Sequence, residues 1–183
     1  MHIRKLLLVS LFMVTVLCGL LLGGCGFHLR NNLSYPGSLQ SLNLDVASSD
    51  NPYFKSSLMQ YLTAMSVDLT TKDKSAFTLK VDNISYKANY SALTSGSSAI
   101  TVGYNFSFKV SIVDSADVVV VPAHVINLHK WVTQNSSQIN TSSNNTLIMH
   151  ELNRDAISRI NDWLVSSATK DYLLTSKRGA NAS

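Results

Sequence analysis

The sequence is poor in cysteine and in charge, and each shortage excludes a class of protein. Cys18 and Cys25 are its two cysteines. Because Cys18 lies in an apolar segment that we expect to be cleaved off, Cys25 would be alone in the mature chain. That excludes an intrachain disulfide and a cysteine-built zinc site. Charged residues make up 14% of the chain and its net charge is only +4, without a Lys/Arg stripe, so nucleic acid is not an expected partner.

An export signal is the clearest feature of the N-terminus. Arg4 and Lys5 precede an uncharged stretch over 6–22 that is rich in Leu and Val. This stretch is shorter than the roughly 20 apolar residues of a transmembrane helix. It ends in the tetrapeptide Leu-Gly-Gly-Cys at 22–25, which resembles the lipobox of bacterial lipoproteins. We therefore interpret 1–24 as a cleaved signal peptide, the other interpretation being a plain membrane anchor with an incidental cysteine.

The lipobox resemblance implies a lipid anchor at Cys25. The sulfur would carry diacylglycerol, and the amine freed by cleavage would take an acyl chain such as palmitate. Two or more chains hold a protein firmly on a membrane, since each buried CH₂ contributes about 0.8 kcal/mol. Gly26 stands where lipoproteins retained in the inner membrane have Asp. The resemblance thus implies a periplasm-facing protein anchored in the outer membrane of a Gram-negative cell.

The rest of the chain predicts one α+β domain over 39–168, between a lipidated tether over 25–38 and a flexible tail over 169–183. Alternating apolar and polar residues indicate strands, and apolar residues at helical spacing indicate amphipathic helices. The order β-α-β-β-β-α predicts two helices packed on one face of a mostly antiparallel four-stranded sheet. The expected strands are 39–46, 77–88, 102–112 and 118–131, and the expected helices are 51–65 and 147–168.

Local signals add detail to this prediction. Asn51 and Pro52 are a good helix start, with a capping side chain before a residue that needs no N–H donor. The alternation changes phase at Asn83, which indicates a bulge. Pro122 indicates an edge strand or a second bulge. The polar segment over 133–145 is expected to form a long loop or a protruding hairpin.

The motifs of common enzymes are missing from the sequence. His124 and His129 are five residues apart on an expected strand, so they should lie on opposite faces and make poor joint metal ligands. Asp114 and Asp117 fit a turn better than a catalytic carboxylate pair. We expect no catalytic residues, no metal and no cofactor.

The opening of the mature chain carries a family resemblance. The hexapeptide Cys-Gly-Phe-His-Leu-Arg at 25–30 resembles the C-G-F-x-L-R start of the lipopolysaccharide-assembly lipoprotein family, LptE. The order of elements, the polar segment before the last helix and the residues 151–156 and 162–164 of that helix are also similar to the family. The resemblance implies a protein without enzymatic activity, which plugs and stabilises the outer-membrane β-barrel that exports lipopolysaccharide.

The resemblance also implies contact with lipopolysaccharide. Four lysines fall on expected strands, and their positive charges could meet phosphate groups; the other interpretation is a set of solvated edge lysines. The loops 91–98 and 134–145 are candidates for contact with the barrel. An auxiliary lipoprotein of a lipid-trafficking ABC transport system is the alternative function, and a periplasmic enzyme is a third. The four candidate lysines are Lys80, Lys87, Lys109 and Lys130.

Replacing the lipobox cysteine tests the anchor directly. We expect Cys25→Ala to prevent lipidation and cleavage, because no sulfur remains to accept diacylglycerol. Mass spectrometry and membrane fractionation of the expressed protein measure both effects, with Cys18→Ala as the control that should mature normally. An acylated, membrane-bound Cys25→Ala protein would contradict the assignment.

Overall fold

The computed structural model describes residues 35–47, 51–90, 99–135 and 142–180. These residues belong to one unit of the chain, Ser34–Ser183, and the description below concerns that unit alone. The predicted signal peptide, the lipidation site Cys25 and the loop 91–98 lie outside the described residues. Among the described helices, none is both long and apolar enough to span a membrane.

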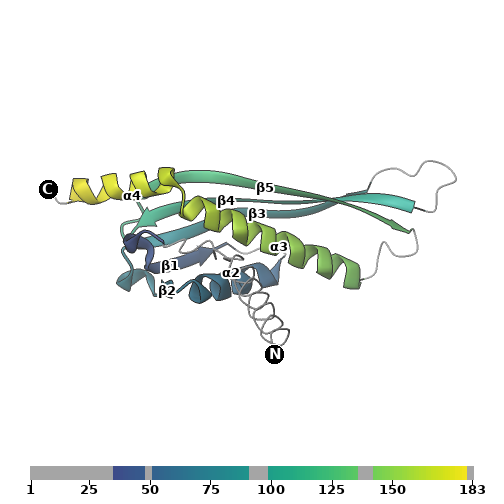
Figure 1. Cartoon of the computed structure of the whole chain (residues 1–183), viewed down its shortest axis with the longest axis horizontal. Coiled ribbons are helices and arrows are strands. Elements are labelled where there is room, and N and C mark those ends of the chain that lie inside the picture. Colours follow the sequence, from purple (N-terminus) through teal and green to yellow (C-terminus); the bar gives the residue numbers. More distant parts are fainter. Residues whose placement is uncertain (1–34, 48–50, 91–98, 136–141, 181–183) are drawn as a thin grey trace, which may run out of the picture. The chain divides into compact units, whose positions relative to one another are not determined.

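Along the chain, a strand, a helix and a short strand come first, then three long strands, and then two helices (Figure 1). Three long strands, β3 to β5, follow one another and carry most of the sheet. The elements are the 3-10 helix η1 (Gly37–Leu39), β1 (Ser41–Val46), α2 (Pro52–Ala64), β2 (Asp68–Leu69), the 3-10 helix η2 (Lys72–Lys74), β3 (Phe77–Tyr90), β4 (Ala99–Asp114), β5 (Val119–Asn135), α3 (Ser142–Leu164) and α4 (Ser167–Ala180).

The sheet has five strands in the order β2-β1-β3-β4-β5 and is mixed. β1 runs parallel to both of its neighbours, whereas β3, β4 and β5 pair antiparallel. The prediction of four mostly antiparallel strands was therefore wrong in two respects. β2 is only two residues long, too short to show an alternating pattern, and it adds to the free edge of β1. Because α2 carries the chain back to the start of β1 before β2 begins, β2 runs parallel to β1.

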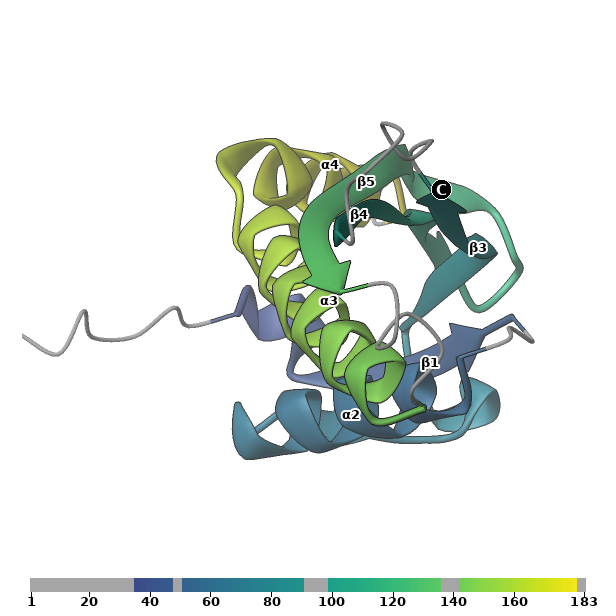
Figure 2. The same cartoon turned by 90° about the vertical axis from the view of Figure 1, so that its right-hand side faces the viewer.

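The core forms where α2 and α3 cover one face of the sheet (Figure 2). Phe54 of α2 meets two phenylalanines of β4, with ring centroids 5.2 Å from Phe106 and 5.4 Å from Phe108. The Phe54–Phe106 contact is edge-to-face at 88°, a favoured aromatic geometry. The sequence predicts an apolar stripe on α3, and its first four members are buried on the same side while Trp163, the fifth, is partly buried; the buried members are Ile148, Leu152, Ala156 and Ile160.

The predicted irregularity of β3 is present. Asn83 has a positive φ of 53°, and the register with β4 shifts between Asp82 and Ser85. This bulge reverses the phase of the alternation, so Tyr86 faces the core like Val81, an odd number of residues earlier. Without it, the apolar side chains of the second half of β3 would point to solvent.

The predicted tail over 169–183 is instead mostly a third helix, α4. Ser166 caps it, because its Oγ accepts a hydrogen bond of 3.2 Å from the backbone N–H of Thr169. Leu173 is buried in the core, with 1% of its surface exposed. The predicted second helix over 147–168 accordingly ends early, at Leu164. The prediction carried one helix through 166–168 and began the tail at 169, whereas in the structure a new helix starts at Ser167.

Two asparagines join α2 to α3 inside the protein. The side chain of Asn51 was predicted to cap α2, but it makes no capping hydrogen bond. It exchanges hydrogen bonds with Asn153, at 2.5 Å from Asn51 Nδ2 to Asn153 Oδ1 and 3.3 Å in the reverse direction. Both residues are buried. This amide pair fixes the start of one helix against the middle of the other.

The predicted tether over 25–38 also needs correction at its C-terminal end. Tyr35 is buried, and its hydroxyl donates a 2.7 Å hydrogen bond to Oδ1 of the buried Asn161 on α3. Burial, and secondarily the neighbouring Tyr61, raises the pKa of Tyr35 above its ordinary value. The folded domain therefore begins at least four residues before the predicted boundary at residue 39.

Truncating an aromatic side chain of the core tests the packing. We expect Phe106→Ala to lower the free energy of unfolding by roughly 3–5 kcal/mol, because a buried ring is removed and a cavity is left. Urea unfolding followed by circular dichroism measures this, and Phe54→Ala should behave alike. Lys109→Ala, on the exposed side of the same strand, should change stability by less than about 0.5 kcal/mol. Equal losses at residues 106 and 109 would contradict the assignment of faces.

Alkaline titration tests the burial of Tyr35. Its phenol ionises near pH 10 in the unfolded chain but at a higher pH in the folded protein. Stability should therefore fall as the pH rises above 10, since only the unfolded chain gains by ionising. Tyr35→Phe should cost about 1 kcal/mol at neutral pH through the lost hydrogen bond. The substitution should also make the free energy of unfolding, measured with urea from pH 8 to 11, fall less steeply with pH. A fall as steep as that of wild type would show that the Tyr35 hydroxyl is accessible to solvent.

Candidate functional site

The sheet face turned away from α2 and α3 is mainly polar, and we call it the outer face. Its residues alternate with the buried residues of the long strands. Serine, asparagine, threonine and lysine predominate, and most of these side chains are exposed or half-buried. A surface of this kind can form many hydrogen bonds while burying little charge. Its members on the long strands include Thr78, Lys80, Ser85, Lys87, Asn105, Ser107, Lys109, Asn127, His129 and Trp131.

The structure brings three of the four predicted lysines to the outer face. Lys80, Lys87 and Lys109 all lie there, and the last two are exposed. Lys130 lies on the opposite face, since its cross-strand partner is the buried Tyr104. Its ammonium forms an ion pair with Glu151 of α3 and so joins β5 to the helix. Lys87 and Lys109 are therefore the lysines best placed to meet an external anion.

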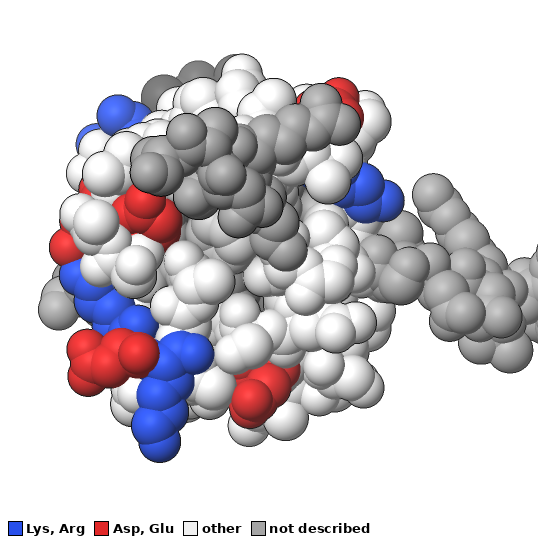
Figure 3. Space-filling view, turned by 90° about the vertical axis from the view of Figure 1, so that its left-hand side faces the viewer, with Lys and Arg blue, Asp and Glu red and all other residues white. Residues whose placement is uncertain are grey.

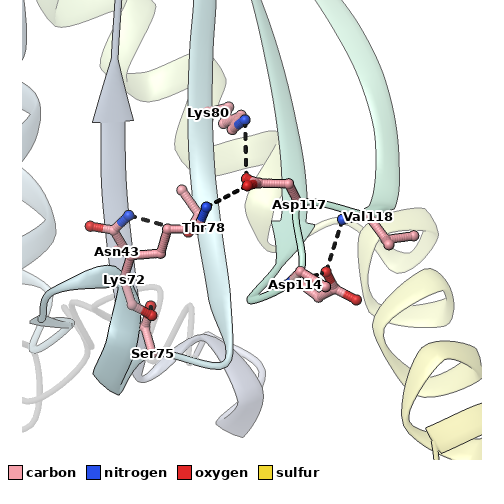
Figure 4. A network of polar contacts seen from close by, with 9 residues as sticks. Asn43, Lys72, Ser75, Thr78, Lys80, Asp114, Asp117 and Val118 are labelled. Atoms are coloured by element: carbon pink, nitrogen blue, oxygen red, sulfur yellow. Dashed lines mark hydrogen bonds and ion pairs between the residues drawn. The ribbon is translucent and has the colours of Figure 1, made fainter.

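Lys80 belongs to a polar network at the turn between β4 and β5 (Figure 4). Its Nζ lies 3.3 Å from Oδ1 of Asp117, and Lys72 pairs with the other oxygen of the same carboxylate. Hydrogen bonds from Lys72, and then from Lys80, hold the pKa of Asp117 below its ordinary value. Asp114 shapes the turn by accepting hydrogen bonds of 2.9 Å from the backbone N–H groups of Ala116 and Val118. The predicted turn at 114–117 is confirmed, and these carboxylates hold structure.

Charges of opposite sign lie close together elsewhere on this end of the unit. Figure 3 shows a group of basic and acidic side chains next to one another, with other charged side chains standing apart on a mostly uncharged surface. Where charges of opposite sign adjoin, their fields at a distance largely cancel. Recognition on such a surface depends on contact more than on long-range attraction.

Structural comparisons define what this fold resembles. No family model and no curated protein match the sequence. A minor lipoprotein from Acinetobacter baumannii matches with a TM-score of 0.51 at 16% identity, over 69% of this chain and 91% of that one. An uncharacterized lipoprotein B from Nitrosomonas europaea matches with a TM-score of 0.50 at 11% identity, over 72% and 88%. This chain has the fold of these bacterial lipoproteins.

The same fold also occurs under another description. A neuraminyllactose-binding hemagglutinin homolog from Helicobacter pylori matches with a TM-score of 0.53 at 11% identity, over 78% of this chain and 94% of that one. Identities this low show the fold alone, so none of these names carries over to this chain as a function. The function must be argued from its own residues.

The two histidines of β5 lie on opposite faces, as predicted. His124 stacks on Trp163 of α3, with centroids 6.4 Å apart and planes 10° apart. His129 lies on the outer face and its Nδ1 is hydrogen-bonded to Oδ1 of Asn105. Among the described residues, no group of three or more His, Cys, Asp or Glu side chains could hold a metal ion. Both histidines thus have packing or hydrogen-bonding partners within the fold.

A shallow groove separates β5 from α3 beside the His124–Trp163 stack. Its volume is about 400 Å³. Arg159 and Asp162 of α3 line it together with His124 and Asn127 of β5. The lining mixes both signs of charge, so the groove shows no preference for an anion or a cation.

The segment predicted as a polar loop over 134–145 is shorter than expected. β5 continues to Asn135 because it stays paired with the start of β4, at Ala99. α3 begins at Ser142, and Asn145 accepts a 2.9 Å hydrogen bond from the hydroxyl of Tyr104. Only 136–141 remain between the two elements, and they lie outside the described residues.

Trp131 is a residue of the outer face that the sequence analysis did not single out. Two-thirds of its side chain, 66%, is exposed, although tryptophan is usually buried in large part. Its cross-strand partner is Gly103. Only the register between β4 and β5 reveals this pair, so neither residue draws attention in the sequence by itself.

Proposed function

We propose that this protein is an outer-membrane lipoprotein that serves as an accessory subunit of the lipopolysaccharide-export β-barrel. The lipid on Cys25 would anchor it, with the folded unit facing the periplasm. It would act by contact with the barrel and with lipopolysaccharide, and the proposal assigns it no catalytic, metal or cofactor role. The hexapeptide at 25–30 carries the proposal, because it starts at the lipobox cysteine of a chain that has the fold of bacterial lipoproteins.

The outer face supports this role on physical grounds. The interior of a large outer-membrane barrel is wet and polar. A face of Ser, Asn and Thr side chains can exchange its water for hydrogen bonds to such a wall. It does so without burying many charges, which would be costly to desolvate. The ion pair of Lys80 with Asp117 further reduces the number of isolated charges on this face.

The exposed lysines extend the proposal to lipopolysaccharide. Lys87 and Lys109 stand on neighbouring strands of the outer face. An ammonium group binds phosphate as a point charge through up to three donors. We assign these two lysines to contacts with phosphate groups of lipopolysaccharide, and the paired Lys80 and Lys130 to holding the fold.

Co-purification tests the proposed partner. The lipidated protein, crosslinked in cells and isolated in detergent, should bring a large outer-membrane β-barrel with it, with crosslinks on the outer face. The Lys87→Glu/Lys109→Glu variant should retain the barrel but carry less lipopolysaccharide, because both contacts become repulsive. Lys55→Glu, an exposed change on α2, is the matched control. Recovery of an inner-membrane lipid transporter or of soluble partners alone would overturn the proposal.

A further inference from the structure

The Trp131 side chain occupies a place on the outer face that only glycine leaves open. A Cβ atom on residue 103 would lie 2.6 Å from Cζ3 and 2.8 Å from Cη2 of the indole. Real Cβ contacts are essentially never shorter than 3.0 Å. Any other residue at position 103 would therefore displace the ring. Gly103 fixes where the indole lies, while two-thirds of the side chain remains open to solvent.

Polar pairs flank the indole on both sides along the two strands. On one side, His129 of β5 is hydrogen-bonded to Asn105 of β4. On the other side, the hydroxyls of Thr101 and Thr133 are 3.1 Å apart. Each pair spans the same two strands as Trp131 and Gly103 and lies two residues along from them, on the same face of the sheet. An exposed aromatic ring thus lies between two hydrogen-bonded pairs of polar side chains. Lys87 of β3 is the cross-strand partner of Asn105.

The chemistry of this arrangement selects one class of ligand. A lipid chain or an apolar helix needs a contiguous apolar surface, and the next residue pairs on the same face as Trp131 are polar in both directions along the strands. A pyranose ring has one apolar C–H face, about the size of the indole, surrounded by hydroxyl groups. We infer that Trp131 and its flanking polar pairs form a binding site for a sugar ring. The ring stacks on the indole, and Asn105, His129 and the threonines meet its hydroxyls.

This inference goes beyond the proposed function, because it holds whatever partner the protein assembles with. The choice of sugar rests on the proposed periplasmic location, where two sources carry such rings: the saccharide of an outer-membrane glycolipid and the glycan strands of the cell wall. A Trp–Gly pair can also serve stability alone, since an aromatic ring shields the glycine backbone from water. Binding measurements separate these roles.

The test is a titration of the full lipidated protein with sugars that carry neither lipid nor phosphate. The detergent must have no sugar headgroup. Maltotriose represents neutral hexoses and chitotriose represents N-acetylated glycan strands, and saturation-transfer NMR measures both affinities. We expect wild-type protein to bind at least one of them. Trp131→Ala should weaken binding at least about tenfold, which is 1.4 kcal/mol and within the range for stacking on an aromatic side chain.

Three further variants separate recognition from folding. Gly103→Ala keeps the indole but displaces it, so binding should fall although tryptophan is present. Trp131→Tyr keeps an aromatic ring and should bind better than Trp131→Ala. Val125→Ala removes another exposed apolar side chain of β5 and should leave binding unchanged. Urea unfolding of each variant identifies any loss that comes from a destabilised fold.

The outcomes are distinct. A preference for chitotriose assigns the site to cell-wall glycan, and a preference for maltotriose assigns it to glycolipid hexose. No binding of either sugar by wild-type protein overturns the inference, and so does equal binding by folded Trp131→Ala. Recovery of the β-barrel should be the same for wild type and Trp131→Ala. If wild-type protein binds sugar but brings no β-barrel with it in the co-purification, that result counts against the proposed function and leaves the sugar site standing.

Discussion

The contact of Phe54 with Phe106 and Phe108 is the interaction on which the rest of the structure depends. It seals α2 against β4 at the centre of the core, and the stripe of α3 completes the cover on the same face. Because β4 alternates strictly along this stretch, burying one face commits every second residue to the other. The outer face thus follows from the core. Its polar residues are the complement of the residues that the helices bury.

The strongest sequence signals predicted the local structure well. Long runs with a period of two predicted β3 and β4, the stretch 118–131 was predicted as the strand that corresponds to β5, and a phase change at Asn83 predicted the bulge. The errors fell where a pattern was too short or ended in small polar residues. β2 has two residues, and the capping Ser166, where α4 begins, was predicted to lie inside the preceding helix. Tyr35 was taken as part of a tether because its partner, Asn161, is 126 residues away.

The sequence pattern of one strand predicts which face of the sheet a residue lies on, but it does not predict which residue of the next strand lies beside it. Alternation along β5 places Lys130 in phase with the buried Ile126, so the sequence held a signal that this lysine faces the helices. The pairing of Trp131 with Gly103 depends on the register of β4 and β5. That register depends in turn on the turn at 114–117 and on the shift near Pro122. Such a pair becomes visible only when the strands are assembled.

The buried Tyr35 limits how far the folded unit can lie from its proposed anchor. It stands ten positions after Cys25 in the sequence, and an extended chain spans at most about 3.3–3.6 Å per residue. Tyr35 would therefore lie within about 35 Å of the lipid, roughly the thickness of a bilayer core. Under the proposed outer-membrane anchor, the start of the folded unit would therefore stay within reach of a barrel embedded in the same membrane, as the proposed function requires.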